Sequence, residues 1–281
     1  MASEMQTVAQ ALRHALSAGL ERLDAQLIVG HVLGRSRAWL IAHDGDALSA
    51  DDAQRIAALV ARRAAGEPLA YLEGDKAFFG LNLRVTPDVL IPRPDTETLV
   101  SWALEVLPTD RPCRVADLGT GSGAIALSIA THRPLSEVWA VDFSAPALAV
   151  AQGNAQALGL GHVRFVQGSW LAPLADQRFD LIFSNPPYIA EGDPHLPALR
   201  FEPITALTAG ADGLSDLRQI VATAGGHMHG NVRGCAHLLL EHGHDQAAAV
   251  GALLREAGFT DVSTRFDFGG QARCTGGRWP G

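Results

Sequence analysis

From about residue 95 onward, short apolar runs alternate with longer stretches that favour helix. The helical stretches include "AIALSIATH" and "APALAVAQGNAQAL". The runs between them, which we expect to form strands, are "RVADLG", "VWAVD", "VRFVQG", "DLIFSN", "AHLLLEHG" and "VSTRF". This alternation is typical of a doubly wound parallel sheet with helices on both faces. It constrains the fold of the chain more than any other feature.

The first 66 or so residues have a purely helical pattern. Apolar residues recur every three or four positions, with much alanine, in "TVAQALRHAL", "LDAQLIVGHVL" and "DDAQRIAALVARRAA". Ser49 with Asp51 and Asp52 is typical of a helix start. "GEP" at 66–68 ends the pattern. We therefore expect a small all-helical domain at the N-terminal end.

A hairpin and a connector are expected next. "FFGLNLRVT" (78–86) alternates like a hairpin strand, and "PDVLIPRPDTE" (87–97) is punctuated by prolines. The sequence thus predicts three parts. They are a helical substrate-recognition domain at 1–73, a hairpin connector at 74–92 and the α/β domain at 93–281.

Composition narrows the class of protein. The chain has 281 residues, of which 47% are hydrophobic and 19% charged, as in a soluble globular protein. No apolar run approaches the roughly 18 residues that a membrane helix needs, and the first residues lack a signal-peptide pattern. We expect a cytoplasmic protein without a membrane partner. The net charge of −8 and the lack of a basic stripe argue against a direct nucleic-acid partner.

The cysteines and histidines do not form a metal-binding pattern. The three cysteines lie far apart, and their odd number argues against a disulfide framework. His227, His229 and His237 lie near Cys235 in "GGHMHGNVRGCAH", but their spacing is irregular. We interpret this segment as a variable loop that leads into a strand, and we predict no metal site.

A glycine-rich loop, "DLGTGSGA" (117–124), follows one predicted strand and opens a helix. Gly119, Gly121 and Gly123 allow a tight turn and a close approach to a ligand. Asp142 ends the next strand, where an acid commonly accepts hydrogen bonds from ribose hydroxyls. Together they favour a ligand with adenosine or another ribose over a merely structural turn. They do not choose between a nicotinamide dinucleotide and S-adenosylmethionine.

The third strand of the α/β region ends in "QGSW" (167–170). This position places Trp170 where an adenine ring would lie, so its indole can stack on the base. A tryptophan that only fills the core remains equally open from this residue alone.

The fourth strand ends in "NPPY", Asn185 to Tyr188. In an open α/β sheet the ligand crevice lies outside the carboxyl ends of the strands, so the tetrad is expected beside the cofactor. Each proline forces the residue before it into an extended conformation, and neither has an N–H. The segment therefore presents two acceptors, the Asn185 side-chain oxygen and the Pro186 carbonyl.

Two neighbouring acceptors match the two hydrogens of a planar amino group, and Tyr188 offers a flat face against it. The nitrogen of such a group is a poor nucleophile because its lone pair is delocalised. Acceptance of both N–H bonds can localise that lone pair, so alignment and electrostatics replace a strong base. This arrangement favours methyl transfer to nitrogen over hydride transfer. A rigid turn without chemistry is the alternative.

Longer segments resemble the release-factor glutamine methyltransferases, the HemK family. The resemblance runs from about residue 66 to 243 through "GEPLAYLEG", "PDVLIPRPDTETLV", "DLGTGSGAIALSIA", "SNPPYIAEGDPHL", "RFEPITALTAG" and "LLLEHG". It implies a seven-stranded class I methyltransferase sheet and S-adenosyl-L-methionine as cofactor. It also implies N5-methylation of the glutamine in the Gly-Gly-Gln motif of class 1 peptide-chain release factors.

The resemblance also implies roles for particular residues. Asn185, Pro186 and Tyr188 would be catalytic, and Asn185 to Tyr188, with Pro187, would hold the substrate glutamine. The cofactor would contact Gly119, Thr120, Gly121, Ser122, Gly123, Asp142, Trp170 and Asn185.

The chain departs from the family in places. Ser169 stands where many relatives have an acid before the tryptophan, which puts a carboxylate contact to adenine in doubt. "GGHMHGNVRGCAH" replaces the usual Pro-Gly-Gly turn. Arg93 and the segment Phe201 to Pro203, which contains Glu202, can line the mouth of the site or be ordinary loop structure. "GGQ" at 269–271 mimics the substrate tripeptide, and we interpret it as a C-terminal turn.

Two alternative functions are compared with this one. A DNA or RNA amino-methyltransferase would share the tetrad but should bring a basic face and a target-recognition region. A non-catalytic adaptor would bind a translation factor through the helical domain, but the intact glycine loop, Asp142 and tetrad argue against it. We expect a protein-glutamine methyltransferase that acts as a monomer.

Overall fold

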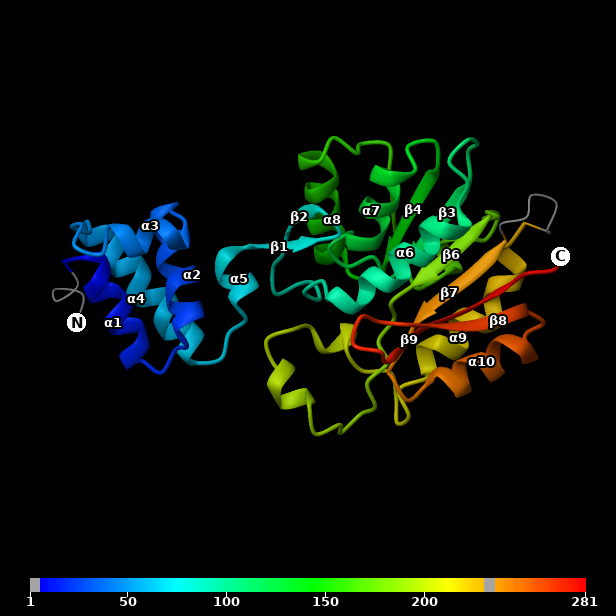
Figure 1. Ribbon diagram of the computed structural model, residues 1–281. Helices are drawn as coiled ribbons and strands as arrows, with labels where there is room; N and C mark the ends of the chain where they lie inside the picture. Colours follow the sequence, from blue (N-terminus) through cyan, green and yellow to red (C-terminus); the bar gives the residue numbers. More distant parts are fainter. Residues whose placement is uncertain (1–5, 230–235) are drawn as a thin grey trace. The chain divides into compact units, whose positions relative to one another are not determined.

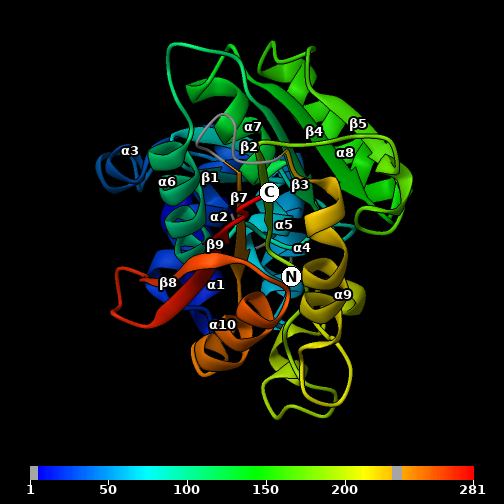
Figure 2. The same cartoon turned by 90° about the vertical axis from the view of Figure 1, so that its right-hand side faces the viewer.

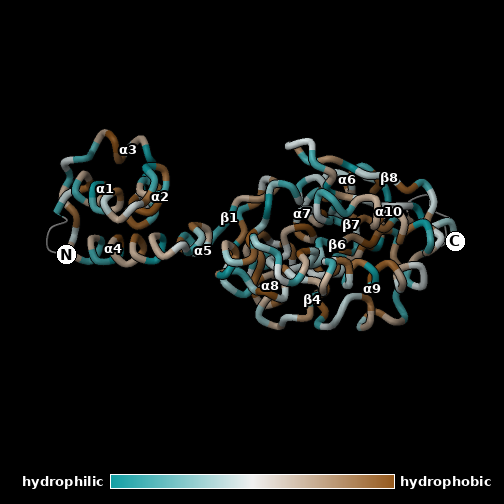
Figure 3. The backbone as a smooth tube through the Cα atoms, turned by 90° about the horizontal axis from the view of Figure 1, so that it is seen from below, coloured by the Kyte–Doolittle hydropathy of each residue, from teal (hydrophilic) through white to brown (hydrophobic). Residues whose placement is uncertain are grey.

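A computed structural model describes residues 6–229 and 236–281 of the chain. These residues form two compact units, one up to Asp75 and the other from Lys76 to Gly281 (Figure 1). Hydrophobic and hydrophilic stretches alternate along the backbone of both units (Figure 3). None of the described helices is both long enough and apolar enough to span a bilayer.

The first unit is helical, as the sequence predicted. Side chains cap three of its helices, including the predicted start at Ser49, whose Oγ accepts a hydrogen bond from the Asp52 N–H at 3.0 Å. Apolar side chains at helical spacing, such as Val29 and Ile56, face one another and form a core of their own. The helices are α1 (Val8–Ser17), α2 (Arg22–Leu33), α3 (Arg37–Ala42), α4 (Ala50–Ala64) and α5 (Leu69–Glu73).

The hairpin consists of β1 (Asp75–Phe78) and β2 (Leu81–Arg84). Both strands lie within the stretch 74–92 predicted for the hairpin. The segment 78–86 is not one strand, because Phe79 and Gly80, both with positive φ, form the two-residue turn. Asn154 ties the hairpin to the glycine loop. Its side chain accepts from the Arg84 N–H at 2.7 Å and donates to the Ser122 carbonyl at 2.8 Å.

Seven strands form one sheet in the order β5-β4-β3-β6-β7-β9-β8, which confirms the predicted fold class. The first five in this order are parallel, and β9 is antiparallel to both β7 and β8. The strands are β3 (Arg114–Leu118), β4 (Glu137–Asp142), β5 (Arg164–Gln167), β6 (Leu181–Ser184), β7 (His237–Glu241), β8 (Thr260–Phe266) and β9 (Ala272–Arg278).

Helices cover both faces of this sheet (Figure 2). One apolar core contains residues of α6 (Glu97–Val106), α7 (Ala124–His132) and α8 (Ala145–Ala157). The other contains residues of α9 (Ser215–Ala224) and α10 (Ala247–Glu256). The order of the strands reverses between β3 and β6, and a crevice at the carboxyl ends of such strands is the usual ligand site of this architecture.

Candidate active site

The glycine loop follows β3 and begins α7. Gly119, Gly121 and Gly123 have φ of 74°, 56° and 85°, a region that side chains with a Cβ rarely adopt. At Gly119 a Cβ would also lie 3.2 Å from the Trp170 ring. These positions therefore require glycine, as the sequence indicated.

Asp117 holds the glycine loop in place through hydrogen bonds to the loop and to the start of α7. Sequence reasoning missed this role, although Asp117 is the first residue of the motif "DLGTGSGA". Its Oδ2 accepts from the Thr120 hydroxyl at 2.7 Å and from the Ala126 N–H at 3.1 Å. The side chain is fully buried, and burial raises the pKa of Asp117 to about 7.

Asp142 lies at the end of β4, where the glycine loop meets it. Its Oδ2 accepts from the Gly121 N–H at 2.8 Å, and its Oδ1 accepts from the Ser144 N–H at 2.9 Å. Burial raises the pKa of this carboxyl, and the backbone hydrogen bonds oppose that shift. The carboxylate is held in one orientation and each oxygen retains a further lone pair for a ligand hydroxyl.

A cavity of about 420 Å³ lies at these strand ends, a size that suits a small organic ligand. It brings together most of the predicted residues: Gly119, Thr120, Gly121, Ser122, Asp142, Trp170, Asn185 and Pro187. Three other predicted residues, Gly123, Pro186 and Tyr188, are described in the structure but lie outside the cavity lining.

Two aromatic side chains lie at the cavity. Trp170 has a φ of 48°, packs against Gly119 and forms a hydrogen bond to the Asp216 carboxylate. Phe143 follows Asp142, lines the cavity and is 76% exposed, so it offers a flat apolar face for a planar base. Sequence reasoning did not single out Phe143, although its place next to the acid was a usable signal.

The tetrad begins one residue after β6. Asn185 donates from Nδ2 to the Thr96 hydroxyl at 3.2 Å. The Tyr188 carbonyl accepts from Gln246 Nε2 at 3.0 Å, and a Cβ at Gly213 would lie 2.2 Å from this carbonyl oxygen. Burial raises the pKa of the Tyr188 hydroxyl above its ordinary value, so this hydroxyl stays protonated and cannot serve as a base.

Arg93 and Glu202 join the connector to the loop after the tetrad. The two side chains form an ion pair, and the Ile91 N–H donates to Glu202 Oε2 at 3.1 Å. Arg93 and Pro203 line the cavity. The ion pair between Arg93 and Glu202 therefore holds one side of the cavity wall in place. Arg93 thus lines the cavity, whereas Glu202 does not line it and contacts Arg93 and the Ile91 backbone.

Glu202→Ala is expected to lower the free energy of unfolding by about 1–3 kcal/mol, because the Ile91 N–H loses its partner in a buried place. Urea denaturation of the variant measures the loss. Glu191→Ala, at an exposed position of the same loop region, is the matched control. A loss no larger than that of the control would contradict the role given to Glu202.

No group of three or more His, Cys, Asp or Glu side chains within residues 6–229 and 236–281 could hold a metal ion. His227 ends a short 3-10 helix, and its Nδ1 lies 3.3 Å from the Gln177 carbonyl oxygen. Cys235, with which the histidines were considered, lies outside the described residues.

Comparisons with known proteins agree with this geometry. Residues 5–74 match the family model described as the PrmC N-terminal domain, and residues 96–200 match the Methyltransferase small domain. The release factor glutamine methyltransferase of Bordetella pertussis is 53% identical over 262 residues, or 92% of this chain and 95% of that protein. This chain belongs to the release factor glutamine methyltransferase family. The family member from Escherichia coli is 45% identical and spans 92% of each chain.

Solved structures add only the fold. A methyltransferase from Pyrococcus furiosus superposes with a TM-score of 0.55 at 19% identity, over 79% of this chain and 97% of that one. The hMettl16 catalytic domain superposes with a TM-score of 0.58 at 16% identity, over 81% and 80%. The resemblance drawn from the sequence is thus confirmed for the family and for the methyltransferase fold.

Proposed function

We propose that this protein transfers a methyl group from S-adenosylmethionine to the side-chain amide nitrogen of the glutamine in the Gly-Gly-Gln motif of class 1 release factors. The observation that carries this proposal is the position of the tetrad. Asn185 and Pro187 line the same cavity as the glycine loop and Asp142. Methyl-donor and methyl-acceptor features therefore converge on one crevice at the switch point of the sheet.

The residues of the cavity fit S-adenosylmethionine. Asp142 has lone pairs left for two ribose hydroxyls, and the glycine loop leaves room for the backbone to approach the ligand. Phe143 and Trp170 provide apolar faces for adenine. When bound, S-adenosylmethionine supplies an electrophilic methyl group on its sulfonium.

The chain's own residues prepare the substrate nitrogen. A glutamine amide has two N–H bonds, and in this proposal the Asn185 Oδ1 and the Pro186 carbonyl accept them. Pro186 and Pro187 contribute no competing donor. Alignment of the nitrogen replaces a base, in keeping with a Tyr188 hydroxyl that stays protonated.

For the domains we propose that residues 1–73 recognise the protein substrate, 74–92 connect and 93–281 catalyse. A role in substrate docking explains why a helical unit accompanies a complete catalytic fold. We also propose that the protein works in the cytoplasm, where a translation-factor substrate is found, and that it works as a monomer.

Intact release factor is expected to be methylated with a kcat/KM at least about tenfold higher than a short Gly-Gly-Gln peptide, which corresponds to about 1.4 kcal/mol of docking energy. Steady-state assays with labelled S-adenosylmethionine provide both values. Duplex DNA in place of the release factor tests the alternative substrate class and should take up no label. Equal kcat/KM values on protein and peptide would contradict the docking role of the helical domain. Incorporation of label into DNA would contradict the proposed substrate class.

A further inference from the structure

Glu241 is a buried acid at the end of β7 for which no role has yet been given. In the parallel pairing of β6 with β7, Ser184 lies opposite Leu240. One residue further, Asn185 and Glu241 leave neighbouring strand ends. Glu241 is only 1% exposed. A carboxylate so deeply buried needs compensating contacts.

Those contacts are made with the tetrad and with Thr96, which precedes α6. The Glu241 carboxylate accepts hydrogen bonds from the Thr96 hydroxyl and from the Asn185 side chain, while its Oε2 atom has no hydrogen-bond partner among the described residues. Asn185 Nδ2 also lies 3.2 Å from Thr96 Oγ1, which accepts its second hydrogen. The Nδ2 side of the Asn185 amide is therefore turned toward Thr96 and Glu241, and its Oδ1 is the atom left for a ligand.

We propose that Glu241 is a positioning residue for methyl transfer: together with Thr96 it holds the Asn185 amide so that Oδ1 faces the substrate nitrogen. A flipped amide would place Oδ1 against the Glu241 carboxylate and the N–H bonds toward the substrate amide, which are two unfavourable pairings. The carboxylate also polarises the amide and makes Oδ1 a stronger acceptor. This inference rests on the proposed function and adds a residue to its site.

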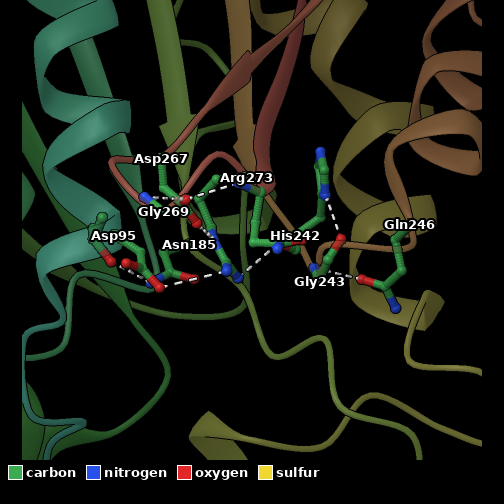
Figure 4. A network of polar contacts seen from close by, with 10 residues as sticks. Asp95, Asn185, His242, Gly243, Gln246, Asp267, Gly269 and Arg273 are labelled. Carbon is green, nitrogen blue, oxygen red and sulfur yellow. Dashed lines mark hydrogen bonds and ion pairs between the residues drawn. The ribbon is translucent and has the colours of Figure 1, made fainter.

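The surroundings of Glu241 make this role depend on pH. Arg273 of β9 and Asp95 of the turn Pro94–Thr96 are the charged groups that face it, and Tyr188 and Cys274 are its other titratable neighbours. Figure 4 shows Arg273 between Asp95 and Asp267, close to Asn185. Burial raises the pKa of Glu241 to about 7, with Arg273 and the two hydrogen bonds opposing the shift.

The sign of the effect follows from these protonation states. Above the pKa of Glu241 the carboxylate only accepts hydrogen bonds, and Asn185 is held with Oδ1 free. Below it the protonated carboxyl can donate a hydrogen bond, so the flipped amide, with Oδ1 against Glu241, is no longer disfavoured and the substrate loses its acceptor. The rate of the transfer step should therefore rise with pH through about 7, where Glu241 ionises.

The test compares Glu241→Met, which keeps the volume but removes both acceptors, with Glu241→Gln, which keeps one. At saturating S-adenosylmethionine, Glu241→Met is expected to lower the single-turnover rate on release factor by about tenfold to hundredfold. The cofactor Kd should stay close to that of the parent. The melting temperature of Glu241→Met should fall, because the buried Thr96 hydroxyl and an Asn185 N–H lose their acceptor, and that of Glu241→Gln should fall less. Glu241→Gln should be faster than Glu241→Met and should lose the rise in rate near pH 7.

Glu105→Met, at a surface ion pair with Arg265, is the matched control and should retain the parent rate and pH profile. A parent-like rate in Glu241→Met would overturn the inference while leaving the proposed function intact. Equal losses of rate, cofactor binding and stability in both Glu241 variants would assign Glu241 a structural role and overturn it as well. A parent enzyme that leaves release factor unmethylated would refute the proposed function, and the inference with it.

Discussion

Asn185→Ala is expected to slow single-turnover methylation of release factor by about 100- to 1000-fold, the loss typical of removing one preorganised polar partner of a reacting group. The Asn185 Oδ1 is proposed to accept an N–H bond of the glutamine as its nitrogen becomes nucleophilic. The loss should therefore fall on kcat, while the cofactor Kd stays near that of the parent. Single-turnover assays measure the rate of methyl transfer, and a separate titration with S-adenosylmethionine measures the cofactor Kd.

Asn82→Ala, at an exposed position of β2, is the matched control for this change. Asn185→Asp is the sharper variant, because it keeps shape and acceptors but adds charge near the sulfonium. We expect cofactor binding at least as tight as in the parent, with slower transfer, since the positive charge dissipates in the transition state. The new carboxylate would also lie beside Glu241, which has lost the Asn185 donor and keeps the Thr96 hydroxyl. Rates within about threefold of the parent in both variants, far short of the expected loss, would reduce the tetrad to scaffolding.

Asp142→Ala is expected to raise the cofactor Kd about tenfold to hundredfold, the equivalent of a charge-assisted hydrogen bond of about 1.5–3 kcal/mol. The variant loses acceptors for the ribose hydroxyls, and it also frees the Gly121 and Ser144 N–H groups that the carboxylate holds. Calorimetric titration with S-adenosylmethionine measures the change.

Asp176→Ala, an exposed aspartate on the same unit, is the control for loss of one negative charge. Circular dichroism should find both variants folded. A Kd for Asp142→Ala equal to that of the control would mean that Asp142 only shapes the loop.

The catalytic fold was predictable because six of its strands are short runs rich in apolar or β-branched residues, separated by helical stretches. The exception is β9, whose sequence "ARCTGGR" has neither an apolar run nor an alternation. Its glycines are required by packing: a Cβ on Gly276 would lie 2.5 Å from the Leu239 side chain. Small residues at such close approaches resemble a turn in sequence, so the antiparallel strand beside β7 becomes visible only in three dimensions.

The candidate site was predictable where its residues are contiguous in sequence or end a recognisable strand. The glycine loop, Asp142 and the tetrad fall in this class, and strand order brings them to one cavity. Thr96 and Glu241 do not, because their contacts with Asn185 join segments far apart in the chain. A usable signal existed in "LLLEHG", since an acid after three leucines ends a buried strand at the same edge as Asp142.

The most direct test of the proposed reaction is to locate the transferred methyl group on the substrate by peptide mass spectrometry. The purified protein is incubated with S-adenosylmethionine and either a class 1 release factor or a copy whose Gly-Gly-Gln glutamine is replaced by asparagine. We expect one methyl group on the side chain of that glutamine in the first protein and none on the second. Methylation at another residue, equal methylation of both proteins, or no methylation of either would contradict the assignment of this chain as a glutamine methyltransferase of release factors.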